Sequence, residues 1–526
     1  MDKPGGGRQG HSLSRRKFLT VAGSAGVAVA ATQFPFAKAR TAPARFTGYP
    51  FTLGVASGDP TSDSVVLWTR LAPSPLAGNG GMPDKAIPVQ WEVAKDENFT
   101  NVVARGEELA TYGDAHSVHA EPQGLQAGFE YFYRFKAGGE ISPTGRTKTA
   151  PSGATSALAF AFASCQQYEH GYYTAYKHMS QEDLDLVIHV GDYIYEYDSN
   201  SYTASGGNVR ANSNHEIVNL ADYRERHAQY KTDPDLQAAH ANFAWLVTFD
   251  DHEVDNNWAT DIPEEGMPLD IFARRRRAAF KAYWEHMPLR KAARPSGNAI
   301  QIFRRAQYGN LATFHVMDTR QFRSDQACGD GNRAGCDDRS NPARTITGAA
   351  QEQWLYDGLQ QSPAKWQILA QQVFMAQMDN TNGAGESYNM DAWDGYKVSR
   401  DKLLDFIDTR KIANPIVITG DVHQNWAADL LRDFRDPASK ILGSEFIGTS
   451  ISTTGDGSDT SNAARLTENP WIKFNNQQRG YVKVSLDQQV CTTDYKVLPY
   501  VKRPGAPITV KKSFVVEAGN PGLKDA

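Results

Sequence analysis

The chain has 526 residues, more than a single hydrophobic core usually serves, so we expect at least two domains. Hydrophobic residues make up 40% and charged residues 22% of it, which is typical of a folded protein and excludes disorder along its whole length. The formal net charge is -5; because residues 1–39 carry +5, the rest carries -10, which argues against a nucleic-acid binder.

The amino end is predicted to be a twin-arginine export signal. Residues 14–19 read Ser-Arg-Arg-Lys-Phe-Leu, an apolar stretch follows over residues 20–32, and residues 37–39 offer an Ala-Lys-Ala cleavage site. A basic tail before an amphipathic helix is the alternative, but it leaves the order of these features unexplained. The apolar stretch is too short for a membrane span and no later segment is long enough, so we expect no transmembrane segment. Residues 1–39 would then engage the twin-arginine export machinery, leaving the protein periplasmic, wall-associated or extracellular.

Residues 46–150 are predicted to form a small all-β domain. Short strands are expected at residues 64–69 and 89–93, between turns rich in proline and glycine. Residues 125–133 alternate in character and include Tyr131 and Tyr133, which resembles the tyrosine-corner strand of fibronectin-type sandwiches. Residues 151–156 then read as a linker, so a fibronectin-like β-sandwich is expected to precede the next domain.

Residues 157–526 alternate between apolar strands and helical stretches. This alternation predicts an α/β fold, a layered domain of β-sheets flanked by helices. Strands are expected at residues 158–163, 186–190, 246–249, 311–317, 366–370 and 416–419, and helices at residues 220–237, 271–287 and 400–411.

Cys328 and Cys336 bracket a short loop that contains glycine and aspartate. In an exported protein a local disulfide is the simplest interpretation. A two-cysteine metal site is the alternative, although no second pair of cysteines or histidines lies near it in the sequence.

Side chains suited to metal binding or acid–base chemistry follow almost every predicted strand of this domain. Ligands of open α/β sheets gather at the carboxyl ends of the strands, and buried charges are costly unless they are paired or metal-bound. Each motif alone is weak, because Gly-Asp is ordinary turn chemistry, but their coincidence at one sheet edge indicates a metal site. The candidates are Cys165, Asp192, Tyr195, Asp251, His252, Arg320, Asp421 and His423.

Three of these motifs carry a family resemblance. They are Gly191-Asp192-x-x-Tyr195, Asp251-His252-Glu253 in place of Asn-His-Glu, and Gly420-Asp421-Val422-His423 in place of Gly-His-x-His. They resemble the motifs of calcineurin-like and purple acid phosphatase metallophosphoesterases. The closer resemblance is to the PhoD-type alkaline phosphatase family, over residues 54–60, 162–166, 248–257 and 318–321, and it extends from residue 51 to the C-terminal strands.

The resemblance implies a centre of Fe3+ and Ca2+. The ferric ion would be held by Cys165, Asp192, Tyr195 and His423, a set rich in anionic ligands. The second ion would take Asp251 and Asp421, with Asp192 as a bridge. These aspartates stand where the wider superfamily has asparagine and histidine, and oxygen ligands suit calcium.

Two further residues are expected to act on the substrate. His252 would donate a proton to the leaving oxygen, and Arg320 would bind two phosphoryl oxygens at once. For Arg320, a structural salt bridge to Asp318 or Asp325 is an equal alternative.

The predicted function is that of a secreted, metal-dependent phosphoesterase that hydrolyses phosphomonoesters, phosphodiesters or both. A phospholipase D-like phosphodiesterase acting on phospholipids would use the same site residues and is the first alternative. The second is a secreted binding protein whose metal site is only structural; structural sites are normally closed, which fits poorly with His252 and Arg320.

Overall fold

The computed structural model describes residues 46–264 and 266–526, and residues 44–526 form one compact unit. The predicted export signal lies outside the described residues. Among the residues described, no helix is both long and apolar enough to cross a membrane.

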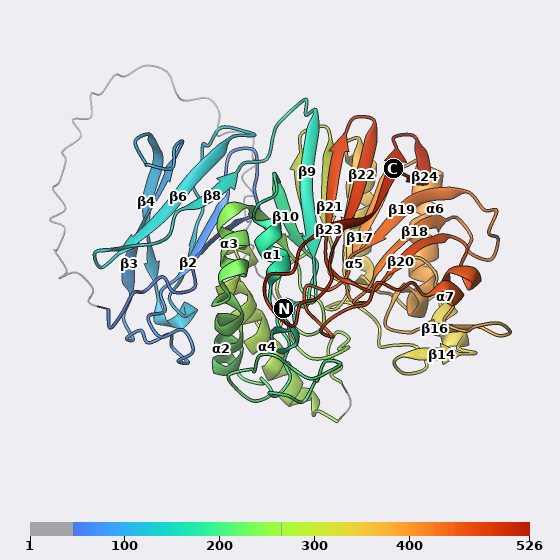
Figure 1. Ribbon diagram of the computed structural model, residues 1–526, viewed down its shortest axis with the longest axis horizontal. Coiled ribbons are helices and arrows are strands. Elements are labelled where there is room, and N and C mark those ends of the chain that lie inside the picture. The colour runs from blue at the N-terminus through green and yellow to red at the C-terminus, as the bar shows by residue number, and fades with distance from the viewer. Residues whose placement is uncertain (1–45, 265) are drawn as a thin grey trace, which may run out of the picture. The chain divides into compact units, whose positions relative to one another are not determined.

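A ten-stranded sheet forms the larger layer (Figure 1). Its centre is parallel, since β9 (Ala157–Ala163), β10 (Leu186–His189) and β11 (Ala244–Val247) all run in one direction. The remaining strands are β1 (Val55–Gly58), β2 (Val66–Arg70) and β5 (Ser117–Ala120) on one side, and β21 (Arg479–Asp487), β22 (Val490–Leu498), β23 (Thr509–Glu517) and β24 (Asn520–Asp525) on the other.

A seven-stranded sheet forms the second layer, again with a parallel centre. Its strands, in spatial order, are β12 (Arg304–Tyr308), β13 (Ala312–Val316), β15 (Trp366–Ala370), β17 (Pro415–Thr419), β19 (Ile441–Ile447), β18 (Asn425–Leu431) and β20 (Ile472–Asn476). All six strands predicted for this part of the chain are therefore confirmed. They are divided between two sheets, three in each.

The two sheets share one buried core. Phe160 of β9 meets Phe314 of β13 with ring centroids 5.2 Å apart, and both belong to a single cluster of buried apolar side chains. Both faces of the parallel strands are buried, which explains why these strands read as continuous apolar runs.

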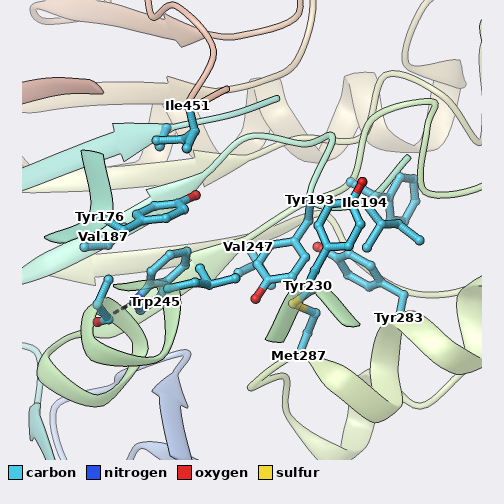
Figure 2. Packing of buried hydrophobic residues seen from close by; sticks show 14 of the residues in the cluster. Tyr176, Val187, Tyr193, Ile194, Tyr230, Trp245, Val247, Tyr283, Met287 and Ile451 are labelled. Atoms are coloured by element: carbon cyan, nitrogen blue, oxygen red, sulfur yellow. Dashed lines mark hydrogen bonds between the residues drawn. The ribbon is translucent and has the colours of Figure 1, made fainter. Parts of the chain in front are cut away.

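Helices cover the outer faces of both sheets. Four of them pack on the ten-stranded sheet around Trp245, Tyr193 and Tyr283 (Figure 2), namely α1 (Thr174–Met179), α2 (Leu220–Lys231), α3 (Pro234–Asn242) and α4 (Leu269–His286). On the seven-stranded sheet lie α5 (Gly348–Gln361) and α6 (Lys397–Arg410), while the short α7 (Ala463–Glu468) contacts β20.

The single helix predicted over residues 220–237 is wrong, because the chain forms α2 and α3 there. The side chain of Asp233 caps α3 by accepting hydrogen bonds from the backbone of Asp235 and Leu236, and Pro234 occupies the first turn. A proline at this position begins a new helix and cannot continue the old one.

The amino-terminal region is all-β, as expected. A five-stranded sheet contains β3 (Ile87–Ala94), β4 (Val102–Ala110), β6 (Glu130–Ala137), β7 (Glu140–Ile141) and β8 (Gly145–Lys148). It packs on β1, β2 and β5 through a separate apolar cluster, so the second wall of this sandwich is the end of the ten-stranded sheet. Tyr131 accepts a hydrogen bond from the backbone of Gln126 at 2.8 Å, a contact of the tyrosine-corner kind.

A small antiparallel sheet of two strands lies apart from these layers. It pairs β14 (Asn332–Ala334) with β16 (Ser387–Asn389), and the disulfide Cys328–Cys336 closes the loop that carries β14. The predicted disulfide is thus confirmed.

Candidate metal centre

The carboxyl ends of strands from both sheets converge on one site. Cys165 follows β9, Asp192 follows β10 and Asp251 follows β11, all from the ten-stranded sheet, whereas Asp421 and His423 follow β17 of the other sheet. The site was expected at the edge of one sheet. It lies where two sheets meet, next to a parallel bridge between Ser164 and Ser450.

Glycine makes this convergence possible. A Cβ atom on Gly191 would lie 2.4 Å from the Cβ of Asp250, and one on Gly420 would lie 2.4 Å from the hydroxyl of Ser164. No larger residue fits at either place, which explains the glycine of both Gly-Asp motifs.

Four candidate ligands have a left-handed backbone. The φ angles are +59° for Cys165, +56° for Asp192, +65° for Asp421 and +54° for His423. Non-glycine residues rarely adopt this conformation, and they concentrate at functional sites.

The four predicted ligands of the first ion lie together. Ligand atoms of Cys165, Asp192 and His423 are all within 4.8 Å of one another. The Tyr195 hydroxyl donates to Asp192 Oδ2 at 2.8 Å and lies 3.3 Å from His423 Nε2. This mixture of sulfur, phenol, carboxylate and imidazole suits a transition metal.

A second cluster contains only oxygen ligands. It consists of Asp250, Asp251 and Asp421, again within 4.8 Å, and Asp192 forms a further group with Asp251 and His252. Asp250 was not predicted as a ligand; the only sequence signal is that it stands beside Asp251 at the end of β11. Three carboxylates around one point suit a hard cation such as calcium.

The electrostatics of both clusters favour the binding of a cation. Burial and neighbouring carboxylates raise the pKa of Asp192 and of Asp421 well above the usual value. Burial and the charge of Asp192 likewise raise the pKa of Cys165 and of Tyr195. Burial, followed by the charge of Arg479, lowers the pKa of His423 to about 3, so its imidazole is neutral and able to bind a metal.

Two buried oxygens support metal binding directly. Asp192 Oδ1 and Asp251 Oδ1 have no hydrogen-bond partner among the described residues. An unpartnered buried carboxylate oxygen is costly, and a bound cation would satisfy it. The residues present therefore fit two cations of different character.

His252 lies beside the clusters, mostly buried, with 8% of its surface exposed. Its Nδ1 is 2.8 Å from Glu196 Oε2, and its ring stacks on that of Tyr195 with centroids 4.2 Å apart. Burial opposes a charge on the ring, but Glu196 and the nearby aspartates raise the pKa of His252 well above its usual value. Glu196, which directly follows Tyr195, was missed by sequence reasoning.

Arg320 is completely buried and its guanidinium is engaged by carboxylates. Nε contacts Asp250 at 2.6 Å, Nη1 contacts Asp391 at 2.9 Å, and Nη2 lies 3.5 Å from Asp251. This differs from the expected bidentate contact with phosphate, because no pair of nitrogens is free. Its partners also differ from the alternative, Asp318 or Asp325, and no local sequence signal pointed to Asp391.

Glu253 organises the backbone of the site. Its carboxylate accepts hydrogen bonds from the backbone amides of Asp192 at 3.1 Å, Tyr193 at 2.5 Å and Asp250 at 2.8 Å. One side chain thus fixes the turns after β10 and β11 relative to each other.

A pocket of about 230 Å3 is lined by the residues on either side of His423 in the chain. Val422 and Gln424, which flank His423, form part of its wall, and Asn332 of the disulfide loop forms another part. Trp426 and Phe374 add apolar surface to the lining, several amide side chains add hydrogen-bonding groups, and Asp394 and Arg465 add charged ones.

Comparisons with known proteins converge on one family. Residues 160–495 match PhoD-like phosphatase, and residues 37–151 match the N-terminal domain of PhoD-like phosphatase. Alkaline phosphatase D of Bacillus subtilis (strain 168) is 52% identical over 525 residues, covering 98% of this chain and 90% of that protein. A solved structure described as "Structure of PhoD" matches with a TM-score of 0.90 at 53% identity, covering 92% of this chain and 93% of the other.

Proposed function

The chain belongs to the PhoD-like phosphatase family and is a phosphoesterase, and from this premise we propose that it cleaves phosphate esters at an iron–calcium centre. The observation that carries the proposal is the meeting of the mixed-ligand cluster around Asp192 with the all-oxygen cluster around Asp251. Catalysis by such an enzyme sets aside the alternative of a binding protein with a purely structural metal.

Each cluster has its own ion in this proposal. Cys165, Asp192, Tyr195 and His423 would hold Fe3+, and Asp251 and Asp421 would hold Ca2+ with the aid of Asp250. Bound together, the ions would neutralise phosphoryl oxygens and lower the pKa of a coordinated water.

His252 supplies the proton in this proposal. Glu196 holds its Nδ1, which leaves Nε2 directed toward the Asp251 side of the site, 3.9 Å from that carboxylate. A proton on Nε2 can pass to the leaving oxygen as the ester bond breaks. The stack on Tyr195 keeps the ring in that orientation.

Arg320 acts as a positioning residue in this proposal. It contacts Asp250 and lies near Asp251, so it sets where two carboxylates of the calcium cluster stand. The pocket beside His423 receives the organic part of the ester, and residues 157–526 carry the whole site, with residues 46–150 as an accessory domain.

The test of this centre is Asp192→Ala, compared with Asp183→Ala at an exposed position. The first variant should lose both bound iron, measured by elemental analysis, and ester hydrolysis; the second should lose neither. Full activity in Asp192→Ala would overturn the assignment.

The substrate class needs a separate measurement. Turnover of a nitrophenyl monoester, a bis-nitrophenyl diester and phosphatidylcholine should favour one of the first two. Preference for phosphatidylcholine would instead establish the phospholipase D-like alternative.

Export is also a proposal, since it rests on residues 1–39. Replacing both Arg15 and Arg16 by lysine should retain active protein inside the cell. Unchanged export of that variant would refute the twin-arginine signal.

A further inference from the structure

The carboxylate of Asp251 is held by a residue six positions further along the chain. The backbone amide of Asn257 donates to Asp251 Oδ2 at 2.8 Å. This bond fixes Oδ2 of the carboxylate, while Oδ1 has no hydrogen-bond partner among the described residues and lies 3.5 Å from Arg320 Nη2. Asn257 therefore holds one oxygen of the Asp251 carboxylate and helps to set the orientation of the other.

Asn257 is itself in an unusual conformation. Its φ angle is +48°, in the left-handed region, which asparagine tolerates better than most residues but which still needs support. Half-exposed on the surface, it would readily relax if its neighbours did not hold it.

That support comes from a distant part of the chain. The side-chain amide of Asn257 donates to Asp330 Oδ2 at 2.5 Å, and the amide of Gln326 donates to the Asn257 carbonyl at 2.6 Å. Gln326 also donates to Asp391, the partner of Arg320. Residues 326–330 therefore contact Asn257, the partner of Asp251, and Asp391, the partner of Arg320.

The disulfide restrains this support. Asp330 lies inside the loop closed by Cys328–Cys336, and the same loop pairs with β16 and accepts a hydrogen bond from the backbone of Met390 at Gly331. Closing a loop removes conformational freedom that an exposed aspartate would otherwise have. Asp330 is thus presented to Asn257 from a restricted position, although its own side chain is on the surface.

We propose that Asn257 is a positioning residue for the cation ligand Asp251, and that the Cys328–Cys336 loop, through Asp330, is the brace that holds Asn257 in place. The inference rests on the proposed function in one respect, that Asp251 binds calcium. Coupling between two sites is reciprocal, so an intact brace raises calcium affinity and bound calcium stabilises the braced loop.

The experiment measures calcium binding to the iron-containing protein from which calcium has been removed, by titration calorimetry, with the calcium-induced shift in Tm as a second measure. Asp330→Ala removes the brace and leaves Asn257 unchanged; the matched control, Asp337→Ala, removes the same charge from an exposed position just outside the loop. We expect Asp330→Ala to weaken calcium binding by about fivefold or more, the low end of typical coupling between sites. Asp337→Ala should stay within about twofold of the parent.

A double-mutant cycle tests the role of the disulfide. Replacing Cys328 and Cys336 by serine should weaken calcium binding as Asp330→Ala does, and combining the two changes should add little, because both remove one brace. Iron content should be unchanged in all variants, and kcat at saturating calcium should be unchanged in Asp330→Ala and Asp337→Ala.

Two outcomes would overturn the inference in different ways. If Asp330→Ala binds calcium as tightly as the parent protein, the proposed brace is refuted, whereas the iron–calcium assignment still stands. If the parent protein binds no calcium, both the proposed brace and the proposed second ion are refuted.

Discussion

Replacing Arg320 by methionine should reveal whether this buried guanidinium holds the carboxylates or the substrate. The change removes contacts to Asp250 at 2.6 Å and to Asp391 at 2.9 Å and leaves both carboxylates buried. The matched control is Arg323→Met, since Arg323 is equally buried and contacts Asp391 at 2.7 Å but not Asp250.

The expected loss in the free energy of unfolding depends on which buried carboxylate each variant leaves without an ion-pair partner. Removing one partner of a buried ion pair costs about 3–5 kcal/mol when the remaining charge is left unpaired. Arg323→Met leaves Asp391 paired with Arg320 and should cost less than that. Arg320→Met leaves Asp391 paired with Arg323 but takes the partner from Asp250, so in a chelator we expect it to be less stable than the control by about 3 kcal/mol. A unit of about 480 residues has an unfolding entropy near 1 kcal/mol/K, so the difference in Tm should be about 3 °C.

Differential scanning calorimetry in chelator and steady-state kinetics in iron and calcium are the two assays. If Arg320 positions the carboxylates, Arg320→Met should show the extra loss of Tm and should need a higher calcium concentration for half-maximal activity. If Arg320→Met has the same Tm as Arg323→Met while its KM for a phosphate ester rises tenfold or more, Arg320 contacts the substrate and does not position the carboxylates.

Three further predictions concern the core, pH and colour. Trp366→Ala empties a fully buried site in β15 and removes the indole bond to the Asp487 carbonyl, so urea unfolding should show a loss of about 3–5 kcal/mol, and a loss below 1 kcal/mol would contradict the packing described. Burial raises the pKa of Glu445 from 4.5 to about 7, so between these pH values the folded state holds a proton that the unfolded state releases. The free energy of unfolding should therefore fall by about 3 kcal/mol between pH 4.5 and 7 relative to Glu445→Gln. The same pH profile in both proteins would refute this prediction. Tyr195→Phe should remove the phenolate part of the visible absorption of the iron-loaded protein, because a ferric phenolate absorbs visible light. Tyr197→Phe should leave the spectrum unchanged. A spectrum of Tyr195→Phe identical to that of the parent would exclude Tyr195 as the ligand.

The sequence was most informative where one short segment carries both the structure and the chemistry. An apolar run followed by Gly-Asp predicts a buried strand and a tight turn, and in β10 and β17 these turns deliver Asp192 and Asp421. The glycines are required by the close approach of neighbouring atoms, so local chemistry and tertiary packing agree at these positions.

Partners from distant parts of the chain could not be predicted in this way. Asp391 lies 71 positions from Arg320 and follows no strand of the two large sheets, so nothing near it in the sequence marks it as the partner of a buried arginine. The division of the strands between two sheets was hidden for a related reason: a strand buried on both faces reads the same in either sheet.

The placement of the site at the junction of the two sheets has a consequence for biosynthesis. Cys165 and His423, which meet in one cluster, are 258 positions apart, so a nascent chain that ends before β17 still lacks Asp421 and His423, and each cluster is then incomplete. Metal loading must therefore wait until most of the chain has left the ribosome and both sheets have closed on each other. A protein made in this order needs its ions in the compartment where it folds, and an export route that carries folded proteins would let it leave already loaded.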